Sequence, residues 1–239
     1  MLESNLPLIL ERIKDSDIVL DVGGCRQPFN RANWVIDFMP FETRGKCGSC
    51  AGPEEHFNKK TWIQRDVCDR SLLPFKDKEI DFVICSHVLE DIRDPVFLCS
   101  EICRIGKKGY IEVPSKYAEL SFGIENPHYA GYSHHRWIVE VKDNTITFLV
   151  KPHFIHYHWK HHFPKRYGRH TRDGKLIQYL FWEGSFKFEE RMAMEHDTLA
   201  LEIEGFIRSK AVYPRLRYNV DKIWDKAKAA LRKHLKSRS

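Results

Sequence analysis

Short apolar segments recur through the first half of the chain, and they constrain the fold more than any other feature of the sequence. Five of them have the composition of buried β-strands: residues 18–22, 34–37, 61–66, 80–85 and 108–113. Strands that are apolar throughout are typical of parallel sheets covered on both faces. Helices are predicted over 6–13 and over 94–104, where Pro95 suits a first helical turn. We therefore predict an α/β fold in which helical stretches separate parallel strands.

The second half of the chain has the pattern of antiparallel strands. Residues 137–141 and 145–150 flank an Asp-Asn dipeptide, which favours a two-residue hairpin turn. Residues 176–182 and 186–188 are predicted to form a further antiparallel pair. The C-terminal half thus adds antiparallel strands to the parallel sheet.

The net charge of +6 is concentrated at the C-terminal end. Residues 215–239 contain nine basic and two acidic residues, whereas residues 1–214 contain 30 basic and 31 acidic residues. A nearly neutral body does not offer the cationic surface that nucleic acids require, so we do not expect a nucleic-acid partner. The seven cysteines, without a secretory leader or an apolar run of about 18 residues, indicate a reduced, cytoplasmic protein.

Glycines and acidic residues follow three of the predicted strands. Gly23 and Gly24 follow the first strand, Asp37 ends the second and Asp66 ends the third. An open α/β sheet binds nucleotide-like ligands at the carboxyl ends of its strands, near the topological switch point. Glycine lets the backbone approach a ligand closely, and a carboxylate accepts both hydrogen bonds of a ribose diol. Asp66 suits a donor such as an adenine amino group.

These residues, in this order, resemble class I S-adenosylmethionine-dependent methyltransferases, and most closely the methyltransferase type 11-like family. The resemblance extends to D-F-V-I-C-S-H-V-L-E-D at 81–91 and to G-Y-I-E-V-P at 109–114, which is similar to the family's fifth strand. It covers residues 16–115. It implies a Rossmann-like fold with a mostly parallel seven-stranded sheet, and S-adenosylmethionine as the cofactor.

The resemblance also implies which residues hold the cofactor. They are Asp21, Gly23 and Gly24 on the methionine side, Asp37 and Phe38 at the ribose and adenine, Asp66 and Val67 at the adenine edge, and Ser86 and His87 at the floor. Cys25 and Gln27 replace later glycines of the family's loop, and Asp91 stands where many relatives have histidine. The two loop residues either narrow the loop and weaken binding or shift the loop. A nicotinamide site is disfavoured, because Gly23 does not begin a G-x-G-x-x-G turn.

The segment after the fifth strand is the predicted place of acid–base chemistry, because in class I folds this region commonly helps to form the acceptor pocket. We predict that His134 or His135 removes the acceptor's proton and that His128 and Tyr132 position the acceptor. The alternative is that these residues are packed, hydrogen-bonded parts of a loop.

The predicted function is methyl transfer to oxygen of a small-molecule acceptor, a sugar or a glycan precursor, although a fold never fixes a substrate. The alternatives are an RNA or protein methyltransferase, or a catalytically silent subunit that binds the cofactor. The sequence identifies neither the acceptor nor the oligomeric state. A measurement of S-adenosylmethionine binding is the experiment that tests whether this chain alone has the cofactor site.

Two further motifs have a metal-binding and a non-metal interpretation. The histidine-rich run at 153–162 could ligate a metal, but without nearby cysteine or carboxylate we prefer a surface that stacks on a sugar ring. Cys47 and Cys50 form a lone C-x-x-C, which is one pair short of a four-thiolate zinc site and is interpreted as part of a reduced loop. We therefore predict no metal site.

The chain is predicted to have three successive regions. Residues 1–125 form the cofactor-binding core, residues 126–214 complete the same domain, and residues 215–239 form a basic amphipathic helix. The helix either docks its apolar stripe on the body, lies on an anionic membrane surface, or contacts RNA. The second interpretation predicts a cytoplasmic protein peripheral to the inner face of the membrane.

Overall fold

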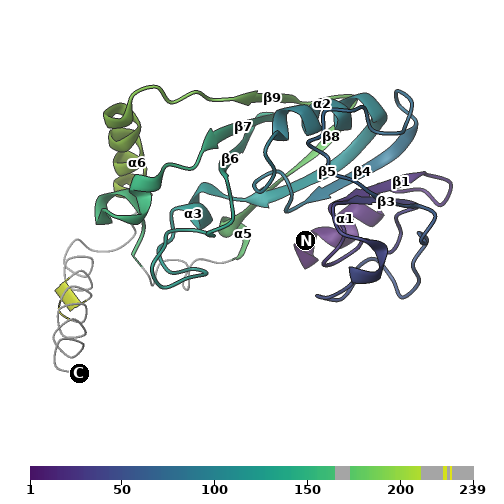
Figure 1. Cartoon of the computed structure of the whole chain (residues 1–239), viewed down its shortest axis with the longest axis horizontal. Helices are drawn as coiled ribbons and strands as arrows, with labels where there is room; N and C mark the ends of the chain where they lie inside the picture. The colour runs from purple at the N-terminus through teal and green to yellow at the C-terminus, as the bar shows by residue number, and fades with distance from the viewer. Residues whose placement is uncertain (165–172, 211–222, 225–226, 228–239) are drawn as a thin grey trace. The chain divides into compact units, whose positions relative to one another are not determined.

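The computed structural model describes residues 1–164, 173–210, 223–224 and 227 (Figure 1). The chain folds into two compact units. Unit 1 comprises residues 1–116, 134–151 and 173–192, and unit 2 comprises the described residues of 117–133, 152–172 and 193–239. The boundaries predicted at residues 125 and 214 follow chain order, whereas these units interleave. The predicted tail helix 215–239 lies outside the described residues, apart from 223, 224 and 227.

A six-stranded sheet forms the centre of unit 1, with the order β3-β2-β1-β4-β5-β8 (Figure 1). Its strands are β1 (Val19–Val22), β2 (Trp34–Asp37), β3 (Trp62–Gln64), β4 (Ile80–Ser86), β5 (Gly106–Pro114) and β8 (Ile177–Glu183). The first five pair in parallel, and β8 pairs antiparallel with β5. The five predicted strands and their parallel pairing are confirmed. The expected seven strands are corrected to six in this sheet.

A second sheet of three strands has the order β6-β7-β9. Strands β6 (Trp137–Lys142) and β7 (Thr145–Val150) form the predicted hairpin, and Asp143 and Asn144 at its turn both have positive φ angles, of 47° and 58°. These angles are the ones that a hairpin turn of type I′ needs.

The prediction that residues 176–182 and 186–188 pair with each other is wrong. Strand β8 lies along β5 over its whole length, and β9 (Lys187–Glu190) pairs in parallel with β7. The reason is the edge of β5, which would otherwise expose its unpaired backbone groups. The alternation of apolar and polar residues in a strand does not indicate with which neighbouring strand it will pair.

Helices are fewer than expected in the first half of the chain. Helix α1 (Leu6–Leu10) follows a 3₁₀ turn. Helix α2 (Pro95–Ile105) is capped at its N-terminus by Asp94, whose carboxylate accepts a hydrogen bond from the Phe97 N–H at 3.0 Å. From β1 to β4, a stretch described throughout, the only helix is the 3₁₀ turn η2 (Phe41–Thr43). The expectation of helical stretches between these strands is therefore wrong. The first crossover, G-G-C-R-Q-P-F-N-R-A-N at 23–33, is rich in residues that disfavour helices.

The remaining helices are short except for the last of them. They are α3 (Lys116–Glu119), η3 (His153–His156), η4 (Trp159–His161), α5 (Asp173–Leu176) and α6 (His196–Lys210). Among the described residues, no helix is both long enough and apolar enough to cross a membrane. In unit 2, the buried face of α6 consists of Leu199, Ile203 and Ile207.

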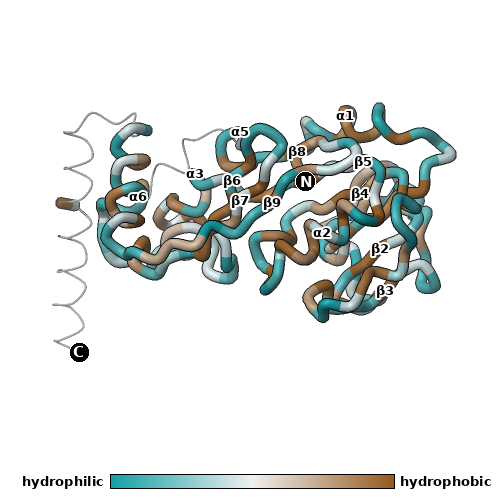
Figure 2. The backbone as a smooth tube through the Cα atoms, turned by 90° about the horizontal axis from the view of Figure 1, so that it is seen from above, coloured by the Kyte–Doolittle hydropathy of each residue, from teal (hydrophilic) through white to brown (hydrophobic). Residues whose placement is uncertain are grey.

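Both faces of the main sheet are covered by apolar side chains, and Figure 2 marks the apolar residues along the backbone in brown. Along β4, Val83 and Cys85 belong to one buried cluster, and Phe82 and Ile84 belong to the other, because successive side chains of a strand point to opposite faces. The first cluster is completed by α2 and the β6–β7 hairpin.

The second cluster shows what replaces the missing crossover helices. It is completed by Ile9 of α1 and by three residues of the irregular crossovers, namely Phe29, Ala32 and Phe57, all of them buried. Because loop residues cover this face, the sheet keeps two buried faces, as the apolar strands require.

Gly109 of β5 marks a close approach that a stability measurement can test. A Cβ atom at this position would lie 2.3 Å from the Val83 carbonyl oxygen and 2.9 Å from the Trp182 ring. We expect Gly109→Ala to lower the free energy of unfolding by about 1–3 kcal/mol in urea titrations, since backbone cannot yield as a flexible side chain does. Gly205→Ala on α6, where a Cβ meets open space, should instead be neutral or stabilise by up to about 1 kcal/mol. Equal urea midpoints for Gly109→Ala and wild type would contradict this packing.

Candidate functional site

A cavity of about 480 Å³ lies at the carboxyl ends of β1, β2, β3 and β4. It is lined by Val22, Gly23, Ile36, Asp37, Phe38, Arg65, Asp66, Val67, Cys68, His87, Val88, Asp91, Ile92, Arg93 and Arg136. The strand order reverses direction between β1 and β4, so the cavity lies at the topological switch point of the sheet. Its volume is in the range of about 300–1,000 Å³ that is usual for small-molecule sites. All of its lining residues belong to unit 1.

The structure brings together six of the nine residues predicted to hold a cofactor. These six, which line the cavity, are Gly23, Asp37, Phe38, Asp66, Val67 and His87. The other three, Asp21, Gly24 and Ser86, are not among its lining residues. The Asp21 carboxylate accepts a hydrogen bond from the Phe29 N–H, and the Ser86 hydroxyl donates to Glu112. The roles assigned to the nine residues stay predictions.

The loop after β1 is shaped by contacts with the protein's own atoms. Gly23 has a φ of 84°, and a Cβ there would lie 2.1 Å from Cγ2 of Val88. A Cβ at Gly24 would lie 2.3 Å from Oδ2 of Asp21. The two glycines are thus required for packing, in addition to any approach of a ligand.

Cys25, which replaces one of the family's glycines, turns its side chain into the core. It is 7% exposed and packs in the buried cluster that contains Phe29, and it is not among the residues that line the cavity. Its N–H donates to Oδ2 of Asp37 at 2.9 Å, which ties the loop to the end of β2. The cysteine side chain therefore does not fill the cavity.

Asp37 has both carboxylate oxygens engaged by backbone and still has lone pairs to offer. Oδ1 accepts from the Met39 N–H at 2.7 Å and Oδ2 accepts from Cys25. Burial raises the pKa of Asp37 above its usual value, although the two backbone donors oppose that shift. Each oxygen accepts a second hydrogen bond in principle, which is the capacity that a diol needs.

Asp21 lies behind this loop as a buried carboxyl. Burial raises its pKa to about 7, against the hydrogen bond from the Phe29 N–H at 2.9 Å, and the charge of nearby Asp37 raises it further. The charge of Asp37 therefore influences the protonation of Asp21, and both carboxylates accept hydrogen bonds from the loop after β1.

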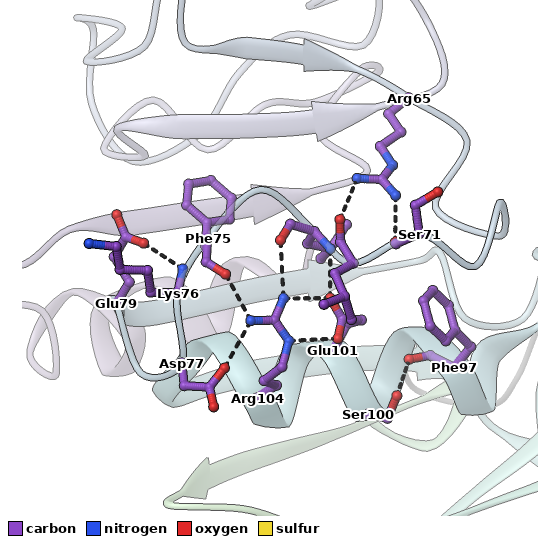
Figure 3. Close-up of polar contacts among 12 residues, drawn as sticks. Arg65, Ser71, Phe75, Lys76, Asp77, Glu79, Phe97, Ser100, Glu101 and Arg104 are labelled. Carbon is purple, nitrogen blue, oxygen red and sulfur yellow. Dashed lines mark hydrogen bonds and ion pairs between the residues drawn. The ribbon is translucent and has the colours of Figure 1, made fainter.

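The loop after β3, which carries Asp66 and Val67, is held by salt bridges. Oδ2 of Asp66 lies 2.5 Å from the Arg93 guanidinium, and Oδ1 accepts from the Cys68 N–H at 2.9 Å. Arg65 bonds with the Asp69 carboxylate, and it donates to the Ser71 carbonyl oxygen (Figure 3). Both carboxylate oxygens of Asp66 therefore already have donors.

The same loop is fastened to α2 at its far end. Arg104 donates to the Glu101 carboxylate at 2.7 Å, to the Phe75 carbonyl oxygen at 2.8 Å and to Asp77 at 3.0 Å (Figure 3). Glu101 also accepts from the Leu73 N–H. This network fixes residues 65–77 on the helix that follows β4, and so it fixes one wall of the cavity.

His87, at the end of β4, lies between two buried carboxylates. Its Nδ1 is 3.2 Å from Oε1 of Glu90 and its Nε2 is 3.1 Å from Oε1 of Glu112. Burial alone would lower the pKa of His87, but the hydrogen bonds to Glu112 and Glu90 outweigh it and raise the pKa to about 9. Although Glu112 is fully buried, its bonds from His87, the Leu2 N–H and the Tyr110 hydroxyl lower its pKa to about 2. At neutral pH the cavity therefore has an imidazolium in its wall.

His134 and His135 lie in unit 1 at the rim of the cavity, where Arg136 follows them in the lining. Nε2 of His135 is 3.8 Å from Oδ1 of Asp91, which lines the cavity. The Arg136 N–H donates to the Glu90 carbonyl oxygen at 2.8 Å, and this bond holds the histidine segment against the segment that follows β4. Local sequence patterns did not predict the part played by Asp91 or Arg136.

The other predicted acceptor residues, His128 and Tyr132, belong to unit 2. His128 is exposed, and its N–H donates to Oδ1 of Asn126 at 3.0 Å. The predicted catalytic histidines are thus divided between the two units.

The histidine-rich run of unit 2 shows packing contacts. The Nδ1–H of His162 donates to the Ile155 carbonyl oxygen at 2.6 Å, and the ring stacks on Phe122 with ring centroids 4.5 Å apart. Burial lowers the pKa of His162 to about 4. Within the described part of the chain, the one His, Cys, Asp or Glu group with metal-ligand spacing is Asp91, His134 and His135. All seven cysteines are free thiols.

Comparison with known proteins gives a family match in the same part of the chain. Residues 46–111 match the family described as a methyltransferase domain. Similar solved structures include an S-adenosylmethionine-dependent methyltransferase from Mesorhizobium loti, with 13% identity over 84% of this chain and 80% of that one and a TM-score of 0.37.

A second similar structure is a chain in the complex that contains the Haloferax volcanii Trm112 methyltransferase activator. It shows 21% identity over 46% of this chain and a TM-score of 0.34. The present chain spans 50% of the length of that one. No curated protein matches the sequence significantly.

The pKa of His87 predicts a pH-dependent contribution to stability. A histidine whose pKa rises from 6.5 to about 9 on folding stabilises the fold fully below pH 6.5, and this contribution is lost as the pH rises through 9. We expect His87→Gln to lower the free energy of unfolding by about 1–2 kcal/mol at pH 6, a range reduced for partial exposure. The deficit should shrink towards pH 9.5 in chemical denaturation. A deficit that is constant from pH 6 to pH 9.5 would show that His87 is not a buried imidazolium.

Proposed function

We propose that this chain, which carries a class I S-adenosylmethionine-dependent methyltransferase domain, transfers a methyl group to an oxygen atom of a small-molecule acceptor, a sugar or a glycan precursor. S-adenosylmethionine supplies an electrophilic methyl group on a sulfonium sulfur. The tasks that remain for the protein are to hold the cofactor, to align the acceptor and to remove the acceptor's proton.

The observation that carries the proposal is the cavity at the switch point of the sheet. It combines a carboxylate at the end of β2, Asp37, with an adjacent aromatic side chain, Phe38, which is 70% exposed. Apolar side chains of Val22, Ile36, Val67, Val88 and Ile92 line the rest. A carboxylate that can accept hydrogen bonds from a ribose diol, beside apolar walls that can pack on a flat base, fits a nucleoside. The residues present therefore suit this cofactor.

The rim of the cavity supports oxygen as the methyl acceptor. His134, His135 and Asp91 bring two imidazoles and a carboxylate together there, and an acceptor hydroxyl needs such groups because it must lose its proton. We propose that His134 and His135 activate the acceptor oxygen.

The choice of a sugar rests on the side chains of unit 2, taken by itself. Tyr129 and Tyr157 are exposed, the latter by 82%, and Trp159 stacks on His158 with centroids 5.8 Å apart. Exposed rings with a polar edge suit an acceptor with an apolar face and several hydroxyls.

Loss of the Asp37 carboxylate should remove cofactor binding. We expect Asp37→Ala to weaken the affinity for S-adenosylmethionine and S-adenosylhomocysteine at least 10-fold in isothermal titration calorimetry, because two diol hydrogen bonds to a carboxylate are lost. Asp197→Ala is the matched control, since the Asp197 side chain is fully exposed on α6 of unit 2 and does not line the cavity. Thermal unfolding of each variant checks the fold, because Asp37 also holds the Cys25 loop. Failure of the wild-type protein to bind either ligand would refute the proposed function for this chain.

Loss of either rim histidine should affect turnover and leave cofactor binding intact. With an acceptor found by screening sugars and polyols for S-adenosylhomocysteine release, His134→Ala or His135→Ala should lower kcat about 100-fold or more. His56→Ala, an exposed histidine of unit 1 outside the cavity lining, should retain the wild-type rate. Wild-type rates in both rim variants would rule out a role for these histidines.

A further inference from the structure

The cluster of Asp91, His134 and His135 has the ligand set of a metal site. One nitrogen of each imidazole and one oxygen of the carboxylate lie within 4.8 Å of one another. Two imidazoles and a carboxylate bind divalent transition-metal ions, and three protein ligands leave further positions open on the ion. His134 is exposed, whereas Asp91 and His135 are half-buried, so the cluster is reached from solvent on one side.

The fold holds the two contributing segments together without help from an ion. The N–H groups of Arg136 and Trp137 both donate to the Glu90 carbonyl oxygen, at 2.8 and 3.2 Å. The Trp137 indole N–H donates to the Ile92 carbonyl oxygen at 2.8 Å. These bonds lie on both sides of Asp91 and next to His135, so the backbone fixes the distance between carboxylate and imidazole.

An oxygen of Asp91 shows that the cluster is incomplete in the protein alone. Oδ1 of Asp91 is buried and has no hydrogen-bond donor, and Nε2 of His135 is 3.8 Å away from it. A buried carboxylate oxygen without a donor costs free energy, which a bound cation removes. Ligands of an ion at about 2.1 Å lie about 3.0–3.4 Å from one another, so a contraction of at most about 1.8 Å from the 4.8 Å limit completes the site.

We propose that Asp91, His134 and His135 bind one divalent transition-metal ion at the rim of the cofactor cavity, and that this ion holds the acceptor's oxygen there. A coordinated hydroxyl has a lowered pKa, so its proton is released to solvent at neutral pH. The ion binding rests on the cluster alone, whereas its catalytic role rests on the proposed function. A histidine that ligates the ion is not itself the base, so the ion takes over the activation of the acceptor oxygen.

The position of the cluster also narrows the class of acceptor. Asp91 and Arg136 both line the cavity, so an ion at the cluster is next to the cofactor and next to a guanidinium. An acceptor that chelates the ion through two neighbouring oxygens, one of them anionic, would satisfy both charges. Sugars with a carboxylate or a phosphate beside the methylated hydroxyl have this chemistry.

The test is direct metal binding by the full chain, purified in chelator and then dialysed free of it. Calorimetry with ZnCl₂ and visible absorption with CoCl₂ should each show one equivalent bound. Asp91→Asn, which is isosteric, and His135→Ala should each weaken binding at least 10-fold. His158→Ala in the histidine-rich run and Cys47→Ser in the C-x-x-C motif are the matched controls and should bind as wild type does.

Two results would overturn the site: no stoichiometric binding of either ion by wild-type protein, or loss of binding in His158→Ala or Cys47→Ser with Asp91→Asn unaffected. Binding of S-adenosylmethionine is measured separately, in the presence of EDTA. If cofactor binds and turnover persists in EDTA, the catalytic role of the ion fails and the proposed function stands. If metal binds and the cofactor does not, the metal site stands and the proposed function fails.

Discussion

The parallel pairing of β1 with both β2 and β4 is the constraint on which the cavity depends. Parallel strands end at the same edge of a sheet, so the residues that follow β1, β2, β3 and β4 are brought to one place although they span residues 22–93. The order β3-β2-β1-β4-β5 sends the chain in opposite directions from β1, and the resulting gap between the loops is the cavity. Without this pairing, Asp37 and His87 would have no reason to face one space.

Buried charge is the second constraint, and it acts directly beneath the cavity. Glu112 is fully buried, and it remains ionised because His87, the Tyr110 hydroxyl and the Leu2 N–H surround it. Removing one partner of such a group leaves an unpaired charge, which is costly in a low dielectric. The floor of the cavity therefore has one arrangement of charges at neutral pH, with the His87 imidazolium between Glu90 and Glu112.

The parts of this site that sequence could predict are those set by local pattern. Apolar runs located the five parallel strands, and an acid or a glycine at the end of a run located Asp37 and Gly23, which line the cavity. The predictions that were wrong concern features that depend on tertiary contacts. The run at 186–188 carries no sign that its strand pairs in parallel with β7, and loop side chains such as Phe29 cover a sheet face that helices were expected to cover.

The cluster of Asp91, His134 and His135 also depends on tertiary contacts and not on local sequence pattern. Asp91 and His135 are far apart in sequence, and the bonds from Arg136 and Trp137 to the carbonyl oxygens of Glu90 and Ile92 bring them together. The sequence drew attention to the histidine-rich run at 153–162, but there His162 is buried and stacked on Phe122. In the histidine-rich run, His162 is thus a packing residue. His134 and His135, by contrast, lie beside a buried Asp91 oxygen without a donor and have the spacing of metal ligands. Backbone contacts, and not local composition, create that geometry, so the proposed ion site follows from the way the segment at Glu90 is bonded to the segment at Arg136.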